Sequence, residues 1–385
     1  MFGKLAPVGN QISLKKSAPV NWQQQYPGYS AQLYGSGTMA LAVAMQLAIK
    51  QVSCMRGVKC PEVILPAYGC PDLISAAVFA GLKPVLVDLE ADSPNYSLPL
   101  LQDTLNKNTV AVVAVNLLGI PDKLEKIRAI TQASDCLLIE DNAQCYPVPG
   151  QPLWGDFMIT SFGRGKPVGL LGGGLLLVRD ELDLGVEASA IEPSAEIVEC
   201  CKWLLYNLLI TPLMYGVVAN IPGLALGKTE YKPLAGIEGM SSSTYWRLKS
   251  NINKYLAASQ KKEPLFSEGL AGLRQYVIDL SLEHRSAIEA PYRLLRVPIL
   301  VRQQADRDPL VSMMQTNGLG ATSFYGLALH EISSVTARVE VRHSCAEASS
   351  FASRLITLPN HDFVKSRHVD GIFSAFDNFF SQKLL

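Results

Sequence analysis

Residues 109–144 read TVAVVAVNLLGIPDKLEKIRAITQASDCLLIEDNAQ. The runs 109–115 and 136–139 are continuously apolar, which is typical of strands that are buried on both faces of a sheet. Between them, 121–134 has the amphipathic spacing of a helix, and Pro121 stands where proline is favoured at a helix start. This order of elements predicts two parallel strands joined by a right-handed crossover helix.

The same alternation continues on both sides of this stretch. We expect helices over 35–52, 70–82 and 98–108, and strands over 61–69, 83–90, 156–163 and 172–180. Alternating strands and helices predict an α/β fold, with a mostly parallel sheet and helices on both of its faces. Ligands of such sheets bind beyond the carboxyl ends of the strands, so polar residues at those ends are candidates for a site.

The pattern changes towards the C-terminus. From about residue 240 the sequence is richer in charge, with strands expected over 297–301 and 354–359 and a closing helix over 368–380. We therefore expect a large domain over 1–239 and a smaller C-terminal α+β domain over 240–385.

Composition excludes several classes of protein. The chain has 385 residues, of which 48% are hydrophobic and 18% charged, and its formal net charge is zero. The absence of a basic excess argues against nucleic acid as a partner. The eight cysteines form no CxxC or Cys/His cluster, so no metal site or disulfide framework is expected. No secretory signal is recognisable, and we predict a cytoplasmic protein.

One long segment carries no charge. Residues 203–226 read WLLYNLLITPLMYGVVANIPGLAL, interrupted by two prolines and flanked by Lys202, Lys228 and Lys232. It is long enough to span a bilayer. It could instead be a dimer interface or a domain-joining helix pair. A third interpretation is peripheral contact with the inner face of a membrane, or with a lipid-like substrate.

Two candidate site features lie at turns of the predicted fold. Gly35, Ser36, Gly37 and Thr38 open a helix, where backbone N–H groups and a hydroxyl can bind an anion such as phosphate. Asp141 ends a buried strand, where a carboxylate is costly unless it meets a cation or donors, and a protonated pyridine nitrogen would serve. Each feature alone is also explained as an ordinary helix cap.

A third candidate feature is a lysine in a glycine-rich loop. Residues 161–178 read SFGRGKPVGLLGGGLLLV, with Ser161 at the end of one strand and Lys166 five residues later. A lysine that forms a Schiff base must be neutral part of the time and must reach its cofactor in a tight pocket. Lys166 alone could equally be an ordinary loop lysine.

Taken in order, these features resemble the fold type I pyridoxal-phosphate (PLP) enzymes, and more narrowly the DegT/StrS-type sugar aminotransferases. The resemblance is carried by YGSGTMAL, VILPAYGC, AGLKPVLVDLE, VVAVNLLGIPDKLEKI, LLIEDNAQ and SFGRGKPVGLLGGG, and by SRLITLPNHDFV near the C-terminus. It is good over residues 30–180 and looser elsewhere. It implies the fold type I architecture, PLP as cofactor and a homodimer built around a two-fold interface.

The resemblance also implies roles for single residues. Lys166 would form the Schiff base and then move a proton as acid and base, while Asp141 would keep the pyridine ring protonated. Gln144 would contact the hydroxyl side of the ring. The phosphate would be bound by Gly37, Thr38 and Ser161, and His330 would lie near the substrate.

Three departures from the family pattern bear on the site. Cys70 stands where the family has an aromatic residue stacked on the cofactor ring, so that Tyr68 takes over this role or the ring is covered differently. The family's Gly-Glu-Gly-Gly after the lysine is replaced by Leu171, Gly172, Gly173 and Gly174, so that its glutamate is lost. An asparagine that reaches the phosphate of the neighbouring subunit is missing, and a serine among residues 241–243 could replace it.

These observations lead to one main functional hypothesis and two alternatives. We expect a PLP-dependent aminotransferase that moves an amino group, from glutamate, to a nucleotide-linked keto-sugar in polysaccharide biosynthesis. One alternative is an acceptor carbonyl on a lipid-like or carrier-linked molecule at a membrane surface. The other is a non-catalytic subunit that keeps the fold and binds a partner. The dehydratase branch of the family has histidine at the position of Lys166, which disfavours dehydration.

Overall fold

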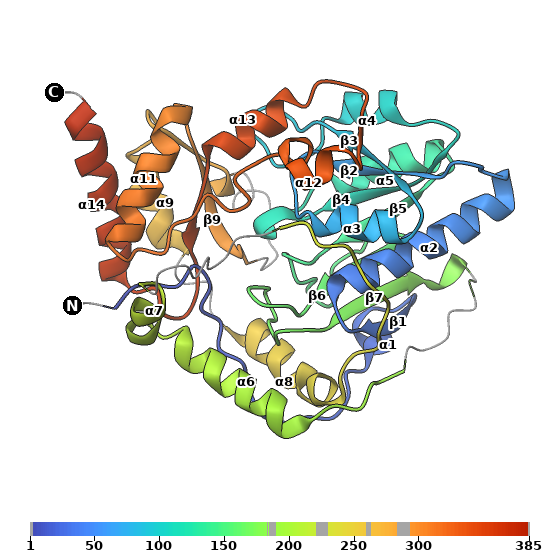
Figure 1. The fold of residues 1–385 in the computed structure, drawn as a ribbon, viewed down its shortest axis with the longest axis horizontal. Helices are drawn as coiled ribbons and strands as arrows, with labels where there is room; N and C mark the ends of the chain where they lie inside the picture. The colour runs from blue at the N-terminus through green and yellow to red at the C-terminus, as the bar shows by residue number, and fades with distance from the viewer. Residues whose placement is uncertain are drawn as a thin grey trace.

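The computed structural model describes residues 3–182, 184, 190–220, 230–258, 263–282 and 293–383 (Figure 1). Its centre is an eight-stranded sheet in the order β1-β7-β6-β5-β4-β2-β3-β10. The strands, in that order, are Tyr29–Tyr34, Gly174–Arg179, Phe157–Ser161, Leu137–Asp141, Thr109–Val115, Glu62–Pro66, Lys83–Val87 and Glu340–Val341. Strand β7 runs in the direction opposite to the other seven strands, which are parallel to one another. This confirms the predicted mostly parallel sheet.

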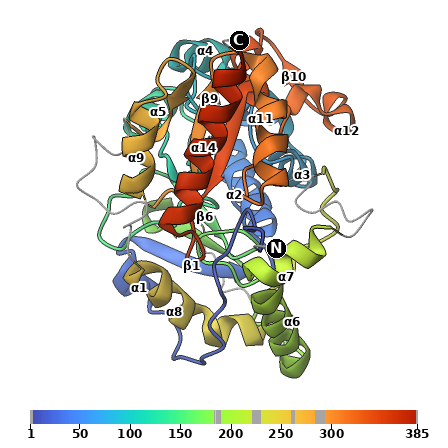
Figure 2. The ribbon, with the colours of Figure 1, turned by 90° about the vertical axis from the view of Figure 1, so that its left-hand side faces the viewer.

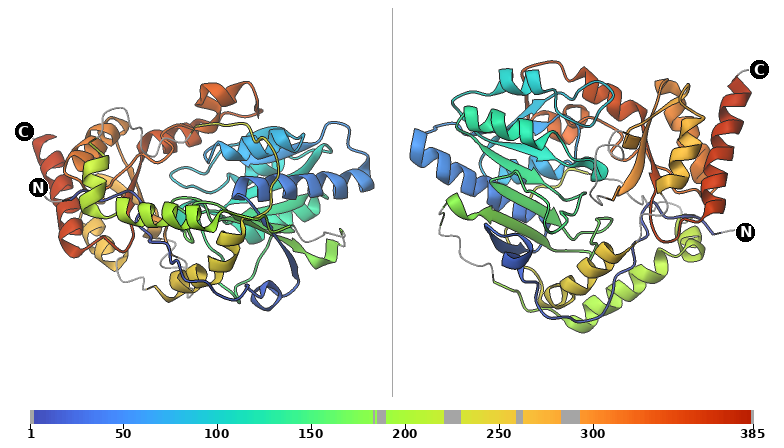
Figure 3. Two further views of the ribbon diagram at one scale, coloured as in Figure 1. Left: turned by 60° about the horizontal axis from the view of Figure 1, so that its bottom comes forward. Right: turned by 180° about the vertical axis from the view of Figure 1, so that it is seen from behind.

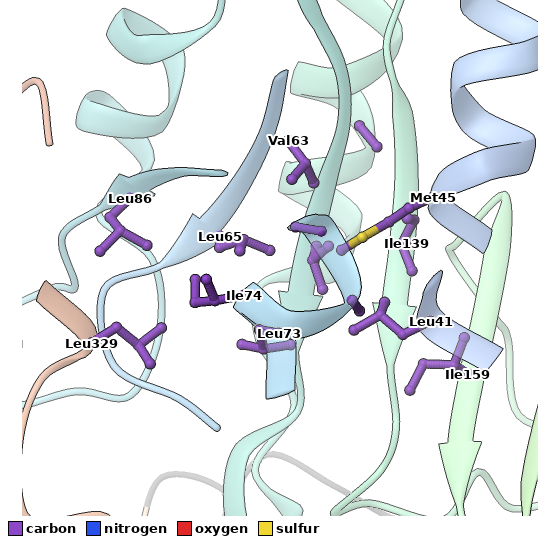
Figure 4. Packing of buried hydrophobic residues seen from close by; sticks show 14 of the residues in the cluster. Leu41, Met45, Val63, Leu65, Leu73, Ile74, Leu86, Ile139, Ile159 and Leu329 are labelled. Carbon is purple, nitrogen blue, oxygen red and sulfur yellow. The ribbon is translucent and has the colours of Figure 1, made fainter. Parts of the chain in front are cut away.

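Helices pack on both faces of this sheet. They include α2 (Gly37–Arg56), α3 (Asp72–Phe79), α4 (Leu98–Thr104) and α5 (Leu124–Ala133). Helix α2 lies against the sheet through Ala40, Ala44 and Ala48, whose small side chains are fully buried and allow close approach. Figure 4 shows Met45 of the same helix beside Ile139, and Leu41 near Ile159. Burial of each such large side chain contributes roughly 1.5–3 kcal/mol.

A second, three-stranded antiparallel sheet lies towards the C-terminal end of the chain. It has the order β11-β9-β8, formed by Leu355–Pro359, Arg296–Val301 and Val277–Asp279. Around it are α9 (Glu263–Ala271), α11 (Gln304–Thr316), α13 (Ala346–Arg354) and α14 (Ser366–Lys383), of which α9, α11 and α14 face the viewer in Figure 2. Short elements connect the parts: α1 (Trp22–Gln25), α12 (Ser333–Thr336), η1 (Leu117–Gly119), η2 (Asp180–Leu182) and η3 (Leu329–Glu331).

Packing crosses the expected domain boundary. Leu248 and Ile252 of α8 (Ser242–Ala257) share a hydrophobic cluster with Ile12 and Phe162. Strand β10 pairs with β3 of the large sheet, although it lies in the C-terminal part of the chain. Segments from both sides of residue 239 therefore take part in the large sheet and its packing. The division of the chain into 1–239 and 240–385 stays a prediction.

The uncharged segment forms two helices as far as it is described. Helix α6 (Glu196–Leu209) and helix α7 (Pro212–Val218) meet at an angle of 94°, and residues 221–226 lie outside the described part. Proline at the first position of α7 fits a new helix start rather than a continued one. Among the described helices none is alone long and apolar enough to cross a membrane; only the bent pair, taken together, meets that criterion.

The turn before α5 holds a buried carboxyl group that makes stability depend on pH. Burial raises the pKa of Asp122 to about 7, although its oxygens accept hydrogen bonds from Lys123 N at 2.7 Å and Tyr96 N at 3.4 Å. The pKa of an unfolded aspartate is about 3.9. Because the folded protein keeps this proton at higher pH than the unfolded chain, stability falls as the pH rises from about 4 to about 7.

Asp122→Asn should therefore weaken this dependence. The amide keeps an oxygen to accept from Lys123 N and has no proton to lose. We expect the free energy of unfolding, measured by urea denaturation, to decline less between about pH 4.5 and pH 7.5 in the variant than in the wild type. Equal declines in the two proteins would show that Asp122 ionises normally in the fold.

Candidate active site

The carboxyl edge of the parallel strands brings the first site residues together. Asp141 ends β5 and Ser161 ends β6, on neighbouring strands of the sheet. Helix α2 begins at Gly37 directly opposite Ser161: a Cβ added to Gly37 would lie 2.6 Å from Ser161 Cβ and 2.9 Å from its Oγ. Only glycine allows the start of α2 to approach this strand end so closely.

This helix start has the properties of an anion cradle. Ser36 caps α2 by accepting a hydrogen bond from Met39 N at 3.2 Å. The first N–H groups of a helix have no acceptor within the helix and carry its positive dipole end. Ser161 Oγ lies at this helix start and accepts from Gly163 N at 3.3 Å. Its hydroxyl proton remains available to donate to a phosphate oxygen.

Thr38 is placed differently from the expectation. Its hydroxyl donates to Asp72 Oδ2 at 3.2 Å, and Asp72 lies in the first turn of α3. To donate to a phosphate, Thr38 would have to give up this bond, and the carboxylate beside it would repel the anion. A phosphate-binding role for Thr38 stays a prediction, with the helix start and Ser161 better placed for it.

Asp141 is a buried carboxyl group with few partners. It is 6% exposed, and its Oδ1 accepts one hydrogen bond, from Ala143 N at 2.8 Å. Burial raises the pKa of Asp141, the Ala143 N–H and the charge of Lys166 lower it, and Asp72 raises it. No ion pair of Asp141 is found among the described residues. A buried carboxylate in this setting would be stabilised by a cation, such as a protonated ring nitrogen.

Lys166 lies on the loop that joins β6 and β7. It is half-buried, its backbone N–H donates to Gly163 O at 3.4 Å, and a Cβ added to Gly163 would lie 3.9 Å from Lys166 Cγ. Its charge acts on both Asp141 and Cys70. Lys166 therefore lies close enough to the buried acid for its charge to act on it, on the loop that follows Ser161 at the start of α2. That these groups form one site stays a prediction.

Gln144 is held by two partners from its own chain. Its Oε1 accepts from Leu118 N at 2.9 Å, and its Nε2 donates to Tyr325 Oη at 2.8 Å. The predicted contact of Gln144 with a cofactor ring thus stays a prediction. Tyr325 was missed by sequence reasoning, although it lies in the run 324–330, FYGLALH, that contains His330. The aromatic pair before Gly326 in that run was the feature of the sequence that could have indicated Tyr325.

Tyr68 and Cys70 lie where the family's ring-stacking aromatic residue was expected to have a substitute. The ring of Tyr68 is 1% exposed and packs on Tyr325 and Phe351, with ring centroids 5.7 Å and 5.0 Å away. Burial raises the pKa of Cys70 to about 12, so its thiol is neutral. Because both aromatic neighbours already cover the Tyr68 ring, stacking of Tyr68 on a cofactor stays a prediction. At the buried Tyr68 Oη, the backbone of Tyr325 is the neighbouring polar group.

His330 lies on a short helical turn next to the segment that contains Tyr68. It belongs to η3, which is fixed beside Tyr68 by a hydrogen bond from Leu329 N to Ala67 O at 2.8 Å. Its Nε2 lies 3.3 Å from Ser349 Oγ, and its Nδ1 is buried without a partner among the described residues. The ring is therefore held through Nε2, and a contact of His330 with the substrate stays a prediction.

The serines that could replace the missing asparagine are engaged within the chain. Ser241 caps α8 and donates to Glu199 at 3.0 Å, while Ser242 and Ser243 both contact Ser194. Beside them lies a cavity of about 690 Å³. Its lining includes Gly35, Gly172, Lys202, Trp203, Ser241 and Thr244. Leu171, the first residue of the run that replaces the family's Gly-Glu-Gly-Gly, also lines it and has a left-handed φ of 64°.

The residues present fit PLP in three respects. A glycine at the start of α2 opens a cradle for the phosphate, Asp141 offers a buried acid to a ring nitrogen, and Lys166 offers an amine nearby. These groups come from three separate segments of sequence. Two non-glycine residues with left-handed backbone, Leu118 and Leu171, flank them, and such strain is concentrated at functional sites.

Known proteins share both the sequence pattern and the fold. The sequence model of the DegT/DnrJ/EryC1/StrS aminotransferase family matches residues 30–185 and 248–377, which leaves α6 and α7 outside the match. The chain is 19% identical to the crystal structure of a DegT DnrJ EryC1 StrS aminotransferase from Brucella abortus, with a TM-score of 0.63 over 93% of this chain and 88% of that chain. This likeness confirms the fold type I architecture.

Two curated relatives match part of the chain. A UDP-N-acetyl-3-dehydro-alpha-D-glucosamine 3-aminotransferase of Acidithiobacillus ferrooxidans is 26% identical over 166 residues, 42% of this chain and 44% of the relative. A GDP-4-keto-6-deoxy-D-mannose 3-dehydratase of Yersinia pseudotuberculosis is 32% identical over 110 residues, 29% of this chain and 27% of the relative. The matches thus span less than half the length of these relatives. Since the family pattern covers well over half of the chain, this protein belongs to the DegT/DnrJ/EryC1/StrS aminotransferase family.

Proposed function

We propose that this protein is a PLP-dependent aminotransferase that transfers an amino group from glutamate to a nucleotide-linked keto-sugar. The observation that carries the proposal is the buried Asp141, which faces the charge of Lys166 beside the start of α2. An acid, an amine and an anion cradle at one edge of a parallel sheet are what the ring nitrogen, the aldehyde and the phosphate of PLP each require. PLP supplies a ring that accepts electrons from the substrate when it is bound.

Each residue would contribute one physical task. Lys166 Nζ would hold the cofactor through its aldehyde and would serve as the acid and base that moves a proton. Asp141 would hold the proton of the ring nitrogen. The first turn of α2, with Gly37 and Ser161, would bind the phosphate. The net reaction exchanges the amino group of the donor for the carbonyl oxygen of the acceptor.

The acceptor is proposed from the relatives. Both act on nucleotide-linked keto-sugars, as their names state, and one of them is an aminotransferase. The other is a dehydratase, but Lys166 stands where that branch has histidine, which favours amination here. The product would be an amino sugar for polysaccharide biosynthesis. The outward apolar helices α6 and α7 favour one second candidate, in which the acceptor carbonyl belongs to a carrier-linked molecule at a membrane surface.

The absorbance of the PLP-loaded protein tests this function. We expect a visible band that bleaches when glutamate is added and returns when a UDP- or GDP-linked keto-sugar follows. Return of the band only with a lipid-linked keto-sugar would select the second candidate. Loading with PLP but no response to any amino donor would contradict the aminotransferase and favour a non-catalytic binding subunit.

Assembly and location are proposed as well. A homodimer follows from the two-fold interfaces around which fold type I sites are built, and a cytoplasmic location from the cofactor and nucleotide-sugar chemistry. Sedimentation of the PLP-loaded protein would give the oligomeric state directly.

A further inference from the structure

Helix α6 is attached to the protein through its polar side. Asn207 Nδ2 donates to Ile12 O at 2.8 Å, and Asn207 Oδ1 accepts from Ile12 N at 2.7 Å. Trp203, the one buried residue of the helix, donates to Leu170 O at 2.8 Å. At its first turn, Glu196 pairs with Arg247 at 2.6 Å and Lys16 at 2.7 Å. Trp203 also belongs to a hydrophobic cluster, against which Cys200 and Tyr206 pack, so that hydrogen bonds, ion pairs and this apolar contact together fix α6.

The opposite side of α6 is apolar and exposed. Ile197 is 81% exposed and Leu204, Leu205 and Leu208 are each more than half exposed, at spacings that place them on one helix face. Helix α7 continues this surface with Leu213, which is 70% exposed, and Val217 at 59%. This is the reverse of the usual arrangement, in which a surface helix turns its apolar face inward. An apolar surface of this kind indicates a contact outside the chain.

The same side of the molecule carries excess positive charge. The N-terminal segment 3–20 lies between α6 and α8, joined to them through Ile12 and through Ser13, whose N–H donates to Asn251 Oδ1 at 2.8 Å (Figure 3). Residues 3–20, α6, α7 and α8 together contain seven Lys and Arg but two Glu. The whole chain has no net charge, so the remaining residues carry the compensating negative excess. We call these four segments the basic apolar face.

This charge decides between two occupants. In a two-fold dimer through this face, the positive segments of one copy would meet those of the other and repel them. An anionic lipid surface attracts them instead. Apolar side chains beside basic ones are the composition of helices that lie in a membrane interface.

Helix length favours lying in the membrane surface over crossing it. Helix α6 has 14 residues, which at the rise of an α-helix gives about 21 Å, against a hydrocarbon core of about 30 Å. The bend of 94° to α7 also prevents the pair from forming one straight span. Both helices lie outside the residues that the sequence model of the family matches.

We propose that the basic apolar face docks this protein on an anionic lipid membrane, with the apolar sides of α6 and α7 inserted at the level of the headgroups. The cavity of about 690 Å³ lies behind α6 and is lined by Lys202 and Trp203 of that helix and by Gly172 of the loop after Lys166. Docking would therefore place this cavity next to the membrane. The proposal does not depend on the chemistry of the site, and it can fail or hold whether or not the protein is an aminotransferase.

Flotation of the PLP-loaded full chain with lipid vesicles tests the proposal. Vesicles of phosphatidylcholine with about 30 mol% phosphatidylglycerol should float with the wild type, and vesicles of phosphatidylcholine alone should bind at least tenfold less. Leu204→Glu/Leu208→Glu should reduce binding to the anionic vesicles at least tenfold. Lys15→Glu/Lys202→Glu should reduce it several-fold, and high salt should do the same to the wild type.

Val78→Glu is the matched control. Val78 is an exposed apolar residue, 43% accessible, on α3 and outside the basic apolar face, so its replacement should leave vesicle binding unchanged. Equal loss in this control, or absence of vesicle binding in the wild type, would overturn the proposal. A wild-type dimer that the Leu204→Glu/Leu208→Glu variant converts to a monomer, without vesicle binding, would overturn it in favour of a second copy. The circular dichroism melt and PLP loading of each variant exclude misfolding.

Discussion

The Lys166→Ala protein will show no visible band of bound PLP. Its transamination rate will be lower than that of the wild type by a factor of roughly 10³ or more. The charge of Lys166 lowers the pKa of both Asp141 and Cys70. Removal of the amine takes away both the attachment point and the group that moves the proton. Absorbance and the glutamate-dependent half-reaction measure the two losses separately.

Lys126→Ala provides the comparison. Lys126 is an exposed residue of α5, away from the strand ends, so that its replacement removes one lysine without touching the site. We expect this variant to load PLP and react as the wild type does. A Lys166→Ala protein with an unchanged visible band would mean that another amine holds the cofactor.

Replacing the buried acid should have the second largest effect. Asp141→Asn keeps an oxygen that accepts from Ala143 N, but it cannot balance the charge of a protonated ring nitrogen. We expect the rate to fall by about 10²–10³-fold, as when one group that stabilises charge is removed from an active site. The apoprotein should be as stable as the wild type or more so, because an uncompensated buried carboxyl group is removed.

Thermal melts with and without PLP separate these effects. In the wild type PLP should raise the melting temperature, since it binds only the folded state. In Asp141→Asn that increase should be much smaller. Glu140→Gln is the matched control: Glu140 is the preceding strand residue and accepts from Asn142 Nδ2 at 2.8 Å and Trp154 N at 3.0 Å. Its replacement should lower stability and leave the response to PLP intact. An increase in the melting temperature of Asp141→Asn with PLP as large as that of the wild type would contradict the proposed role of Asp141.

Much of the fold was readable from the sequence because burial on both faces leaves continuous apolar runs. The strands around 109–115 and 137–141 follow directly from such runs, and Asp141 and Ser161 are conspicuous because they end them. The start of α2 was predictable from Gly37 and its capping serine. These are local signals, since each depends on a few neighbouring residues.

Contacts between distant segments were not predictable in this way. Asp72 meets Thr38, and Tyr325 meets Gln144, through packing that brings together residues 34 and 181 positions apart. The orientation of α6 was equally hidden. A helix with apolar residues on one face has the same periodicity whether that face turns inward or outward. The polar anchors of α6, such as Asn207, become recognisable only when Ile12 is seen beside them.

Reduction of the PLP-loaded protein with borohydride, followed by peptide mapping, tests the central claim most directly. Borohydride converts a lysine–PLP linkage to a stable secondary amine, so that the attached residue can be identified by mass spectrometry. The account predicts one labelled peptide, with the cofactor on Lys166. A label on a different lysine, or a protein that binds PLP and yields no labelled peptide, would contradict it.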